Sequence, residues 1–269
     1  MRNKYFMLLL ISPAKTLDFT TPSPTSEFSQ PDFLKQSRQL IKELRSLSSA
    51  GVAELMNVSE KLGVLNFQRF KDWRTPFTEK NAKQALFAFQ GDVYTGMAAE
   101  QFSPADIQFA QQRLRILSGL YGVLRPLDLI QPYRLEMGTS FANSRGKNVY
   151  EFWGDAITGK LNQQLTASKS TLVINLASNE YFSAVKTKLL NADIVTPVFK
   201  DKKNGQYKII SFFAKKARGM MSAYIIKNQI TDPNQLKQFN VGGYSFNQSQ
   251  SNEHVFIFTR EELGAEVNL

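Results

Sequence analysis

Blocks of apolar positions with a helical period alternate along the chain with short apolar runs that are typical of buried strands. Residues 6–11 form an almost continuous apolar run, which predicts a strand covered on both faces, as in a parallel sheet. Apolar residues spaced three and four apart predict helices in the segment that follows. The expected elements there are helices over 32–47, 52–62, 66–72 and 81–86, and an aromatic strand over 87–89.

The second half of the chain continues this alternation. Asn204 and Gly205 separate two strand-like segments, which predicts a tight antiparallel hairpin. The expected elements are strands over 171–176, 194–199, 207–213 and 255–258, and helices that follow Ser178 and start at Ala214. The fold class is therefore predicted to be α/β (mixed α+β), a single compact globule around a mixed sheet.

One domain is expected over residues 1–269, because no low-complexity linker divides the chain. Only residues 20–31, with three prolines among serines and threonines, have the character of an extended surface connection. The hydrophobic fraction of 42% and the length of 269 residues suit a folded globule with a substantial core.

A helix-hairpin-helix-like element is predicted where a helical pattern meets two glycines. Ser103, Pro104 and Asp106 mark the start of the first helix, and an apolar stripe continues it to 117. Gly119 and Gly122 leave backbone N–H groups uncovered, and nearby arginines would make this turn suit a nucleic-acid phosphate. The alternative is that the first glycine only ends a helix and the second only serves a turn.

Substitution of Gly122 distinguishes these alternatives. In a surface hairpin that grips phosphate, Gly122→Val is expected to remain folded and to bind DNA poorly. If the glycine only satisfies a positive φ, the same substitution lowers stability and leaves the binding of the folded protein unchanged.

The charge of the chain favours a polyanionic partner. Lysine and arginine outnumber aspartate and glutamate by 33 to 23, which gives a net charge of +10 and a pI near 9.6. A basic surface that serves only solubility is the alternative. No run of five or six like charges is present, so a nucleic-acid site would have to be a basic cleft in the folded domain.

The scarcity of metal-binding side chains excludes several kinds of site. The chain has no cysteine and one histidine, which rules out disulfides, thiolate metal sites and multi-histidine metal centres. No Walker loop, dinucleotide-binding glycine fingerprint or zinc-hydrolase motif is present. We therefore expect no cofactor and no bound metal.

The amino-terminal residues superficially resemble a signal peptide. The apolar run over 5–11 is at the shortest limit for such a segment and is much too short to span a bilayer, which favours the buried strand. Nothing else supports export, so we expect a cytoplasmic protein that does not bind a membrane.

Polar residues near strand ends and around a cationic cluster are candidates for chemistry. Lys215, Lys216 and Arg218 lie at a predicted helix start, where a bound phosphate would offset their unfavourable interaction with the helix dipole, although ordinary solvated charge explains them equally. The carboxylates near them would form ordinary surface ion pairs unless the fold brings them together. An enzyme acting on a small anionic, nucleotide-like substrate would use one pocket lined by Lys15, Tyr94, Arg134, Glu136, Asp155, Asn175 and Lys215.

These motifs together resemble the YaaA family of bacterial peroxide-stress proteins. The matching blocks cover nearly the whole chain in order: LLLISPAKTLD at 8–18, GDVYTG at 91–96, LSGLYGVLRPLD at 117–128, QPYRLEMG at 131–138, FWGD at 152–155, NLAS with EYF at 175–182, and KKARG at 215–219. Members of that family usually begin at the residue that matches Met7. Residues 1–6 therefore look like an amino-terminal extension, with translation starting at either Met1 or Met7.

The resemblance implies a cytoplasmic protein, induced in peroxide stress, that limits harm from unincorporated iron and binds DNA in a positively charged cleft. It implies a mixed α/β fold with a helix-hairpin-helix-like element and no well-established reaction. The leading hypothesis is thus binding to DNA phosphates, largely without sequence specificity and with no stable protein partner, and the rival is the enzyme. The DNA-binding candidates are Arg113, Arg115, Gly119, Gly122, Arg125, Lys215, Lys216 and Arg218.

Overall fold

A central sheet organises the computed structural model, which describes residues 7–262. The predicted extension, residues 1–6, lies outside the described residues. Five neighbouring strands in the middle of the sheet are parallel, and antiparallel strands flank them, so the predicted mixed α/β class is confirmed. The strand order is β11 (Ser245–Phe246), β12 (Val255–Arg260), β9 (Asp193–Lys203), β8 (Leu172–Leu176), β1 (Met7–Ile11), β5 (Leu114–Ser118) and β6 (Gly122–Leu124), with β10 (Gln206–Lys208) paired to β9.

Strand β1 occupies an interior position in this sheet. It pairs in parallel with β5 on one side, with Leu9 opposite Leu114, and with β8 on the other, with Leu9 opposite Ile174. All five of its residues are buried, as expected for a strand whose two faces are both covered. The strand predicted at the start of the chain is confirmed over 7–11.

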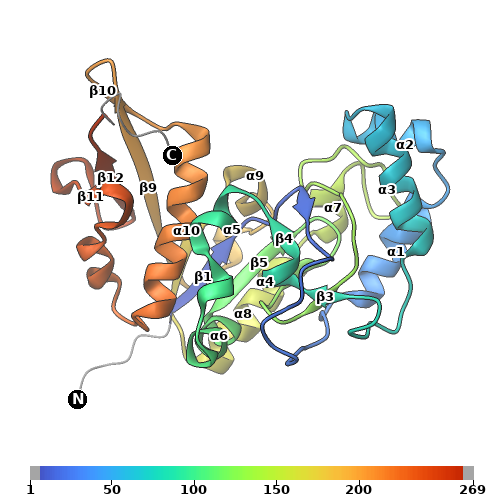
Figure 1. Cartoon of the computed structure of the whole chain (residues 1–269), viewed down its shortest axis with the longest axis horizontal. Coiled ribbons are helices and arrows are strands. Elements are labelled where there is room, and N and C mark those ends of the chain that lie inside the picture. The colour runs from blue at the N-terminus through green and yellow to red at the C-terminus, as the bar shows by residue number, and fades with distance from the viewer. Residues whose placement is uncertain (1–6, 263–269) are drawn as a thin grey trace.

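The helices lie around the sheet and form two lobes (Figure 1). One lobe contains the first three helices, and the opposite one contains β9 to β12 and the long helix α10. Two small antiparallel pairs, β2 (Thr16–Leu17) with β4 (Phe89–Gln90) and β3 (Lys83–Gln84) with β7 (Leu129–Ile130), lie apart from the main sheet. The α-helices are α1 (Leu34–Leu44), α2 (Ser49–Met56), α3 (Glu60–Asp72), α4 (Ala85–Ala88), α5 (Asp92–Met97), α6 (Pro104–Arg113), α7 (Val149–Trp153), α8 (Ala156–Ser168), α9 (Asn179–Phe182) and α10 (Ser211–Lys227).

Helices α2 and α3 form a short helical hairpin. The single helix predicted over 52–62 is wrong, because Asn57 adopts a left-handed conformation and Ser59 caps a new helix. Gly63 allows the two helices to pack closely, since a Cβ there would lie 2.5 Å from the Cβ of Ala53. Helix α3 includes the residues of the basic helix predicted over 66–72.

The helix-hairpin-helix predicted around the two central glycines is wrong. Helix α6 has the predicted capping box between Ser103 and Asp106, but it ends at Arg113. The next residues form β5, and a tight turn leads into antiparallel β6. The apolar run of residues 114–117 fits either a helix or a buried strand, and pairing with β1 determines the outcome.

Other local predictions were correct in part. Residues 20–31 contain no helix or named strand, as expected of an extended connection. The antiparallel hairpin at Asn204 and Gly205 is confirmed, although its second strand ends at 208 and α10 begins at 211. The helix over 81–86 and the strand over 87–89 are wrong, because β3, α4 and β4 divide that segment. The helix after Ser178 ends at Phe182.

Candidate anion-binding site

A cavity of about 370 Å³ lies at the carboxyl ends of β1 and β8, the edge where α/β folds place ligands. Ser12 directly follows β1, and Ser178 lies just beyond β8. The backbone N–H of Ser178 donates to the Ser12 hydroxyl over 2.9 Å, which holds the two loops together. The cavity is lined by residues 12–16, 90–94, Glu136, Ser178, Glu180, Tyr181, Lys215 and Arg218.

Glu136 brings two cations together at this cavity. Its carboxylate contacts the Lys15 amino group at 2.8 Å and the Arg134 guanidinium at 3.1 Å. Arg134 is mostly buried, whereas the Lys15 side chain is 62% exposed. Two cations thus share one carboxylate, so Lys15, Arg134 and Glu136 together carry a net positive charge.

Arg218 is a cation of the cavity that has no partner among the described residues. Its side chain is half-buried in α10, and it forms no hydrogen bond or ion pair with the residues that the structure describes. Burial lowers the pKa of Arg218, and no carboxylate opposes that effect. Lys215, three residues earlier on the same face of the helix, lines the same cavity. Asp92, Glu136 and Glu180 also line the cavity, but none of them pairs with Arg218, so this half-buried cation can receive a bound anion.

Two buried tyrosines form part of the cavity wall. The Tyr94 hydroxyl donates to the carbonyl of Ser12 over 3.2 Å. Burial raises the pKa of Tyr94 and that of Tyr181 well above the usual value, so both phenols are neutral at physiological pH. They therefore provide aromatic surface and hydrogen bonds and do not act as bases.

The structure brings together most of the enzyme candidates. Lys15, Tyr94, Glu136 and Lys215 line the cavity, and Arg134 is tied to it through Glu136. Two other candidates lie elsewhere. The Asp155 side chain is exposed and pairs with Lys186 at 2.5 Å, and the buried Asn175 accepts a hydrogen bond from the backbone of Ala177.

Four of the DNA-binding candidates are buried. The Arg115 guanidinium donates to the Gln164 side chain at 2.7 Å, and burial lowers the pKa of Arg115 to about 10, so it stays charged at neutral pH. Arg113 packs its guanidinium over the Phe109 ring at the end of α6. Gly119 lies in the turn that follows β5, and Gly122 is the first residue of β6. This burial is incompatible with the expectation that these four residues contact phosphate.

The remaining DNA-binding candidates differ in whether their charge is free to contact a phosphate. Arg125 pairs with buried Asp128 at 2.9 Å and donates to the carbonyl of Gln30, so its charge is already compensated. Lys216 lies on α10 but does not line the cavity, whereas Lys215 and Arg218 do. The helix begins at Ser211, so all three cations lie beyond its first turn. The helix dipole is therefore not a reason to expect a phosphate beside them.

Substitution of Gly122 is now expected to destabilise the protein. Gly122 has a φ of +69°, and an added Cβ would lie 2.8 Å from the ring of Trp153. We expect Gly122→Val to lower the free energy of unfolding by at least about 2 kcal/mol, from backbone strain and overpacking together. Gly205 is the matched control, because its φ is +74° and no atom lies within 4 Å of an added Cβ. Equal losses in the two valine variants by denaturant unfolding would contradict the packing contribution.

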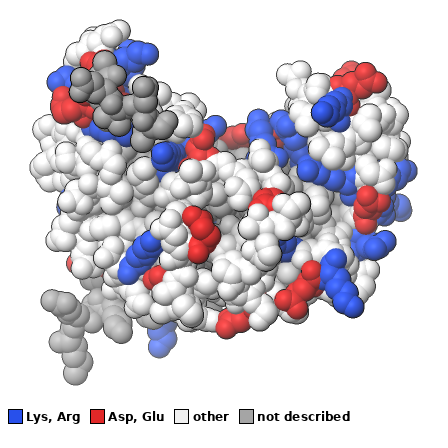
Figure 2. Space-filling model, viewed as in Figure 1, with Lys and Arg blue, Asp and Glu red and all other residues white. Residues whose placement is uncertain are grey.

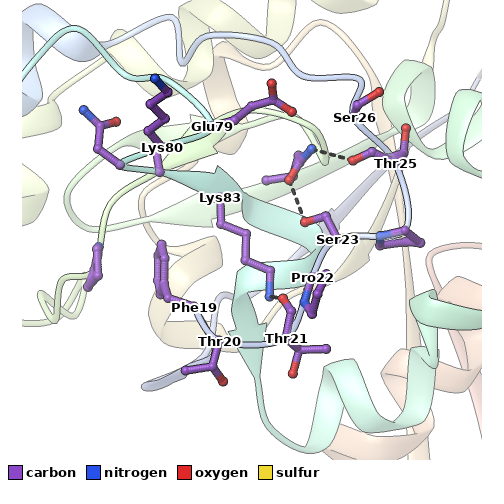
Figure 3. A pocket seen from close by; sticks show the side chains of 15 residues that line it. Phe19, Thr20, Thr21, Pro22, Ser23, Thr25, Ser26, Glu79, Lys80 and Lys83 are labelled. Atoms are coloured by element: carbon purple, nitrogen blue, oxygen red, sulfur yellow. Dashed lines mark hydrogen bonds between the residues drawn. The ribbon is translucent and has the colours of Figure 1, made fainter.

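A larger cavity of about 600 Å³ lies beside the connection over 20–31 (Figure 3). Its buried lysine, Lys83, donates to the carbonyls of Asp18 at 2.9 Å and Thr21 at 2.7 Å. The Gln84 side chain likewise accepts from Ser23 and donates to Thr25. These groups fasten the connection to the domain, so this cavity is a weaker candidate for a ligand site than the one beside Arg218.

Sequence reasoning missed part of the site. Ser12, Asp92, Ser178 and Tyr181 line the cavity but were not among the candidates. The position of the two serines just beyond buried strands was a usable signal, whereas only the tertiary fold reveals Asp92 and Tyr181.

Within residues 7–262, no group of three or more histidine, aspartate or glutamate side chains is arranged to hold a metal ion. No helix in that range is long and apolar enough to cross a membrane.

Comparison with known proteins gives matches over nearly the whole chain. The family described as "Peroxide stress protein YaaA" matches residues 7–250. A UPF0246 protein of Cellvibrio japonicus is 63% identical over 256 residues, which cover 95% of this chain and 99% of the relative. UPF0246 proteins of Aliivibrio fischeri and Neisseria meningitidis are 59% and 57% identical over the same shares.

Proposed function

Because the chain belongs to the YaaA family of peroxide stress proteins, we propose that it is a cytoplasmic protein that binds DNA phosphates largely without sequence specificity. We also propose that this binding limits damage from unincorporated iron. The observation that carries the proposal is the half-buried Arg218, which forms no ion pair with a described residue and lies beside Lys215 in the cavity. A phosphate oxygen bound there would supply the missing counter-charge and charge-assisted hydrogen bonds.

A row of cations extends from this cavity toward the opposite lobe. Lys15 and Arg134 share Glu136. Arg69 of α3 carries the next positive charge. Burial, and then the positive charge of Arg134, lower the pKa of Arg69. Arg69 and Arg74 line a second cavity of about 360 Å³. Cations distributed over both cavities suit a polyanion better than one small anion.

The shape of the surface agrees with this arrangement. Figure 2 shows a hollow between the lobe that contains α10 and the lobe that contains α1 to α3, with lysine and arginine side chains on both sides and some aspartate or glutamate side chains between them. Helix α9 lies between these lobes in Figure 1. The net charge of +10 would attract DNA toward such a hollow.

A salt series tests DNA binding directly. We expect the affinity for two unrelated duplexes of equal length to fall together with salt, with a log-log slope of about −0.9 for each phosphate neutralised. Fluorescence anisotropy on labelled duplexes measures both slopes. Salt-insensitive binding, or a large preference for one duplex, would contradict binding through phosphates alone.

The proposed limitation of iron damage has its own test. Ferrous iron and peroxide nick supercoiled plasmid DNA, and we expect the protein to reduce nicking in proportion to the DNA that it occupies. Raising the salt concentration until the complex dissociates should abolish the protection. Protection that persists without binding would show that the protein acts on iron or peroxide instead.

The convergence of polar residues favours one second candidate, an enzyme that acts on a small anionic, nucleotide-like substrate. Lys15, Tyr94, Glu136 and Lys215 surround one cavity whose volume lies within the usual range of small-molecule sites. Calorimetry with nucleoside monophosphates tests this candidate. Binding that Glu136→Gln alters while DNA affinity persists would favour it, and absence of binding would remove it.

A further inference from the structure

A further cavity, of about 390 Å³, lies in the lobe that contains β9 to β12 (Figure 1). Its walls come from β9, β11 and β12, from the 3₁₀ helix Pro233–Gln238 and from the segment 248–253. Among the described residues, it shares no lining side chain with the candidate anion-binding site. Its volume lies within the usual range of small-molecule sites. We call it the Lys237 cavity, after the lysine in its wall.

Two aromatic rings hold the charge of Lys237, which is half-buried. Its amino group lies 5.7 Å from the ring centroid of Phe246 and 5.1 Å from that of Phe256. The two rings meet edge to face with centroids 5.8 Å apart, so they form a corner that attracts the ammonium group. Over residues 7–262, Lys237 forms no hydrogen bond or ion pair. Its positive charge is therefore held in place and can still receive an anion.

A carboxylate at the same cavity restricts the kind of anion that fits. Glu253 lines the Lys237 cavity but contacts His254 at 3.4 Å, and its side chain is 85% exposed. One ammonium group neutralises one negative charge. A phosphate dianion would therefore leave a second charge without a cation, beside the carboxylate of Glu253. The cavity thus favours a singly charged anion such as a carboxylate.

The remaining walls combine apolar surface with an amide donor. Val195 and Pro233 line the cavity beside the aromatic corner. The side-chain oxygen of Asn252 accepts from the backbone N–H groups of His254 and Val255, over 2.9 Å and 2.8 Å. Within the part of the chain that the structure describes, the NH₂ group of Asn252 has no partner. A ligand with one apolar ring and one carboxylate would match both kinds of wall.

We propose that the Lys237 cavity binds a small monocarboxylate that carries an aromatic ring. The carboxylate accepts charge-assisted hydrogen bonds from the ammonium group of Lys237. The ring of the ligand packs on the apolar wall and gains edge-to-face contact with the phenylalanine rings. This site goes beyond DNA binding, which is proposed to involve Lys215 and Arg218 at another cavity. Either property can therefore fail while the other persists.

Four small probes test this class of ligand on the full chain. We expect phenylacetate to bind, and we expect acetate, which lacks the ring, to bind at least about tenfold more weakly. Phenylacetamide, which has the ring but no charge, should be weaker by a similar factor. Phenyl phosphate, a dianion above neutral pH, should also bind more weakly than phenylacetate. Titration followed by NMR measures these affinities, and the backbone amides that shift should lie within 233–237 and 246–256.

Matched lysine variants locate the bound probe. Lys237→Met keeps an unbranched side chain over the two rings, and it should weaken phenylacetate binding by about tenfold or more. Lys227, on α10, lies 5.9 Å from the ring centroid of Phe102 and does not line the cavity, so Lys227→Met should leave the affinity unchanged. Thermal unfolding confirms that both variants are folded. Failure of phenylacetate to bind, equal affinities in the two variants, or tighter binding of phenyl phosphate would overturn the proposal.

Discussion

Reversing the charge of Lys215 and Arg218 to glutamate is expected to weaken binding to duplex DNA by roughly thirtyfold or more at low salt. The pair lines the candidate cavity, and neither side chain forms an ion pair with any residue over 7–262 that must first be broken. Loss of two charge-assisted contacts amounts to about 2–4 kcal/mol, which corresponds to that change in affinity or a larger one. The log-log salt slope should also become shallower by about 1.8 if both residues contact phosphates.

A matched double reversal separates this local effect from net charge. Lys169 and Lys188 are exposed and precede β8 and β9, so they lie near the opposite edge of the sheet. Reversing both to glutamate changes the net charge by the same amount and is expected to weaken binding much less. Equal losses in the two double variants would show that long-range charge, and not the cavity, determines affinity.

Replacing Gly219 by valine is expected to lower the free energy of unfolding by at least about 3 kcal/mol. Gly219 lies where α10 crosses α5, and an added Cβ would lie 1.9 Å from the carbonyl oxygen of Val93. Gly96, on α5, has the corresponding position, with the carbonyl oxygen of Lys216 at 2.1 Å from an added Cβ. The two backbones are thus in direct contact, and a side chain at this crossing must separate the helices.

Gly159 provides the control for this prediction. It lies within α8, and an added Cβ there meets nothing within 4 Å. We expect Gly159→Ala to stabilise the protein by about 0.5–1 kcal/mol, because alanine favours a helix more than glycine does. Denaturant unfolding measures both variants. A Gly219→Val protein as stable as the parent would mean that the two helices can separate at little cost.

Local signals predicted much of the fold. The apolar run of β1, the Asn204 and Gly205 hairpin, and the capping box of α6 each depend on interactions between residues close in sequence. The segment after α6 was mispredicted because its run of apolar residues is compatible with both a helix and a buried strand. Its pairing with β1 involves residues about a hundred positions away, which no local pattern contains.

The candidate site was predictable where polar residues follow strands. Lys15, close behind β1, was identified in this way. The burial of Arg113 and Arg115 was not predictable, since arginine is rarely buried. These two residues also precede glycines whose spacing is typical of a surface turn. Arg218 was identified as a phosphate contact, but only the fold shows that it shares a cavity with Tyr94.

The interior position of β1 has a consequence for how the chain folds during synthesis. Its pairing partner in β8 leaves the ribosome some 165 residues after Leu9, because Leu9 pairs with Ile174. At ordinary rates of translation, this delay is roughly 10–30 s. Throughout that time, one of the most apolar segments of the protein lacks one of its two neighbouring strands. The apolar surface of β1 is therefore open to aggregation, or to chaperones that shield nascent chains, until β8 has emerged.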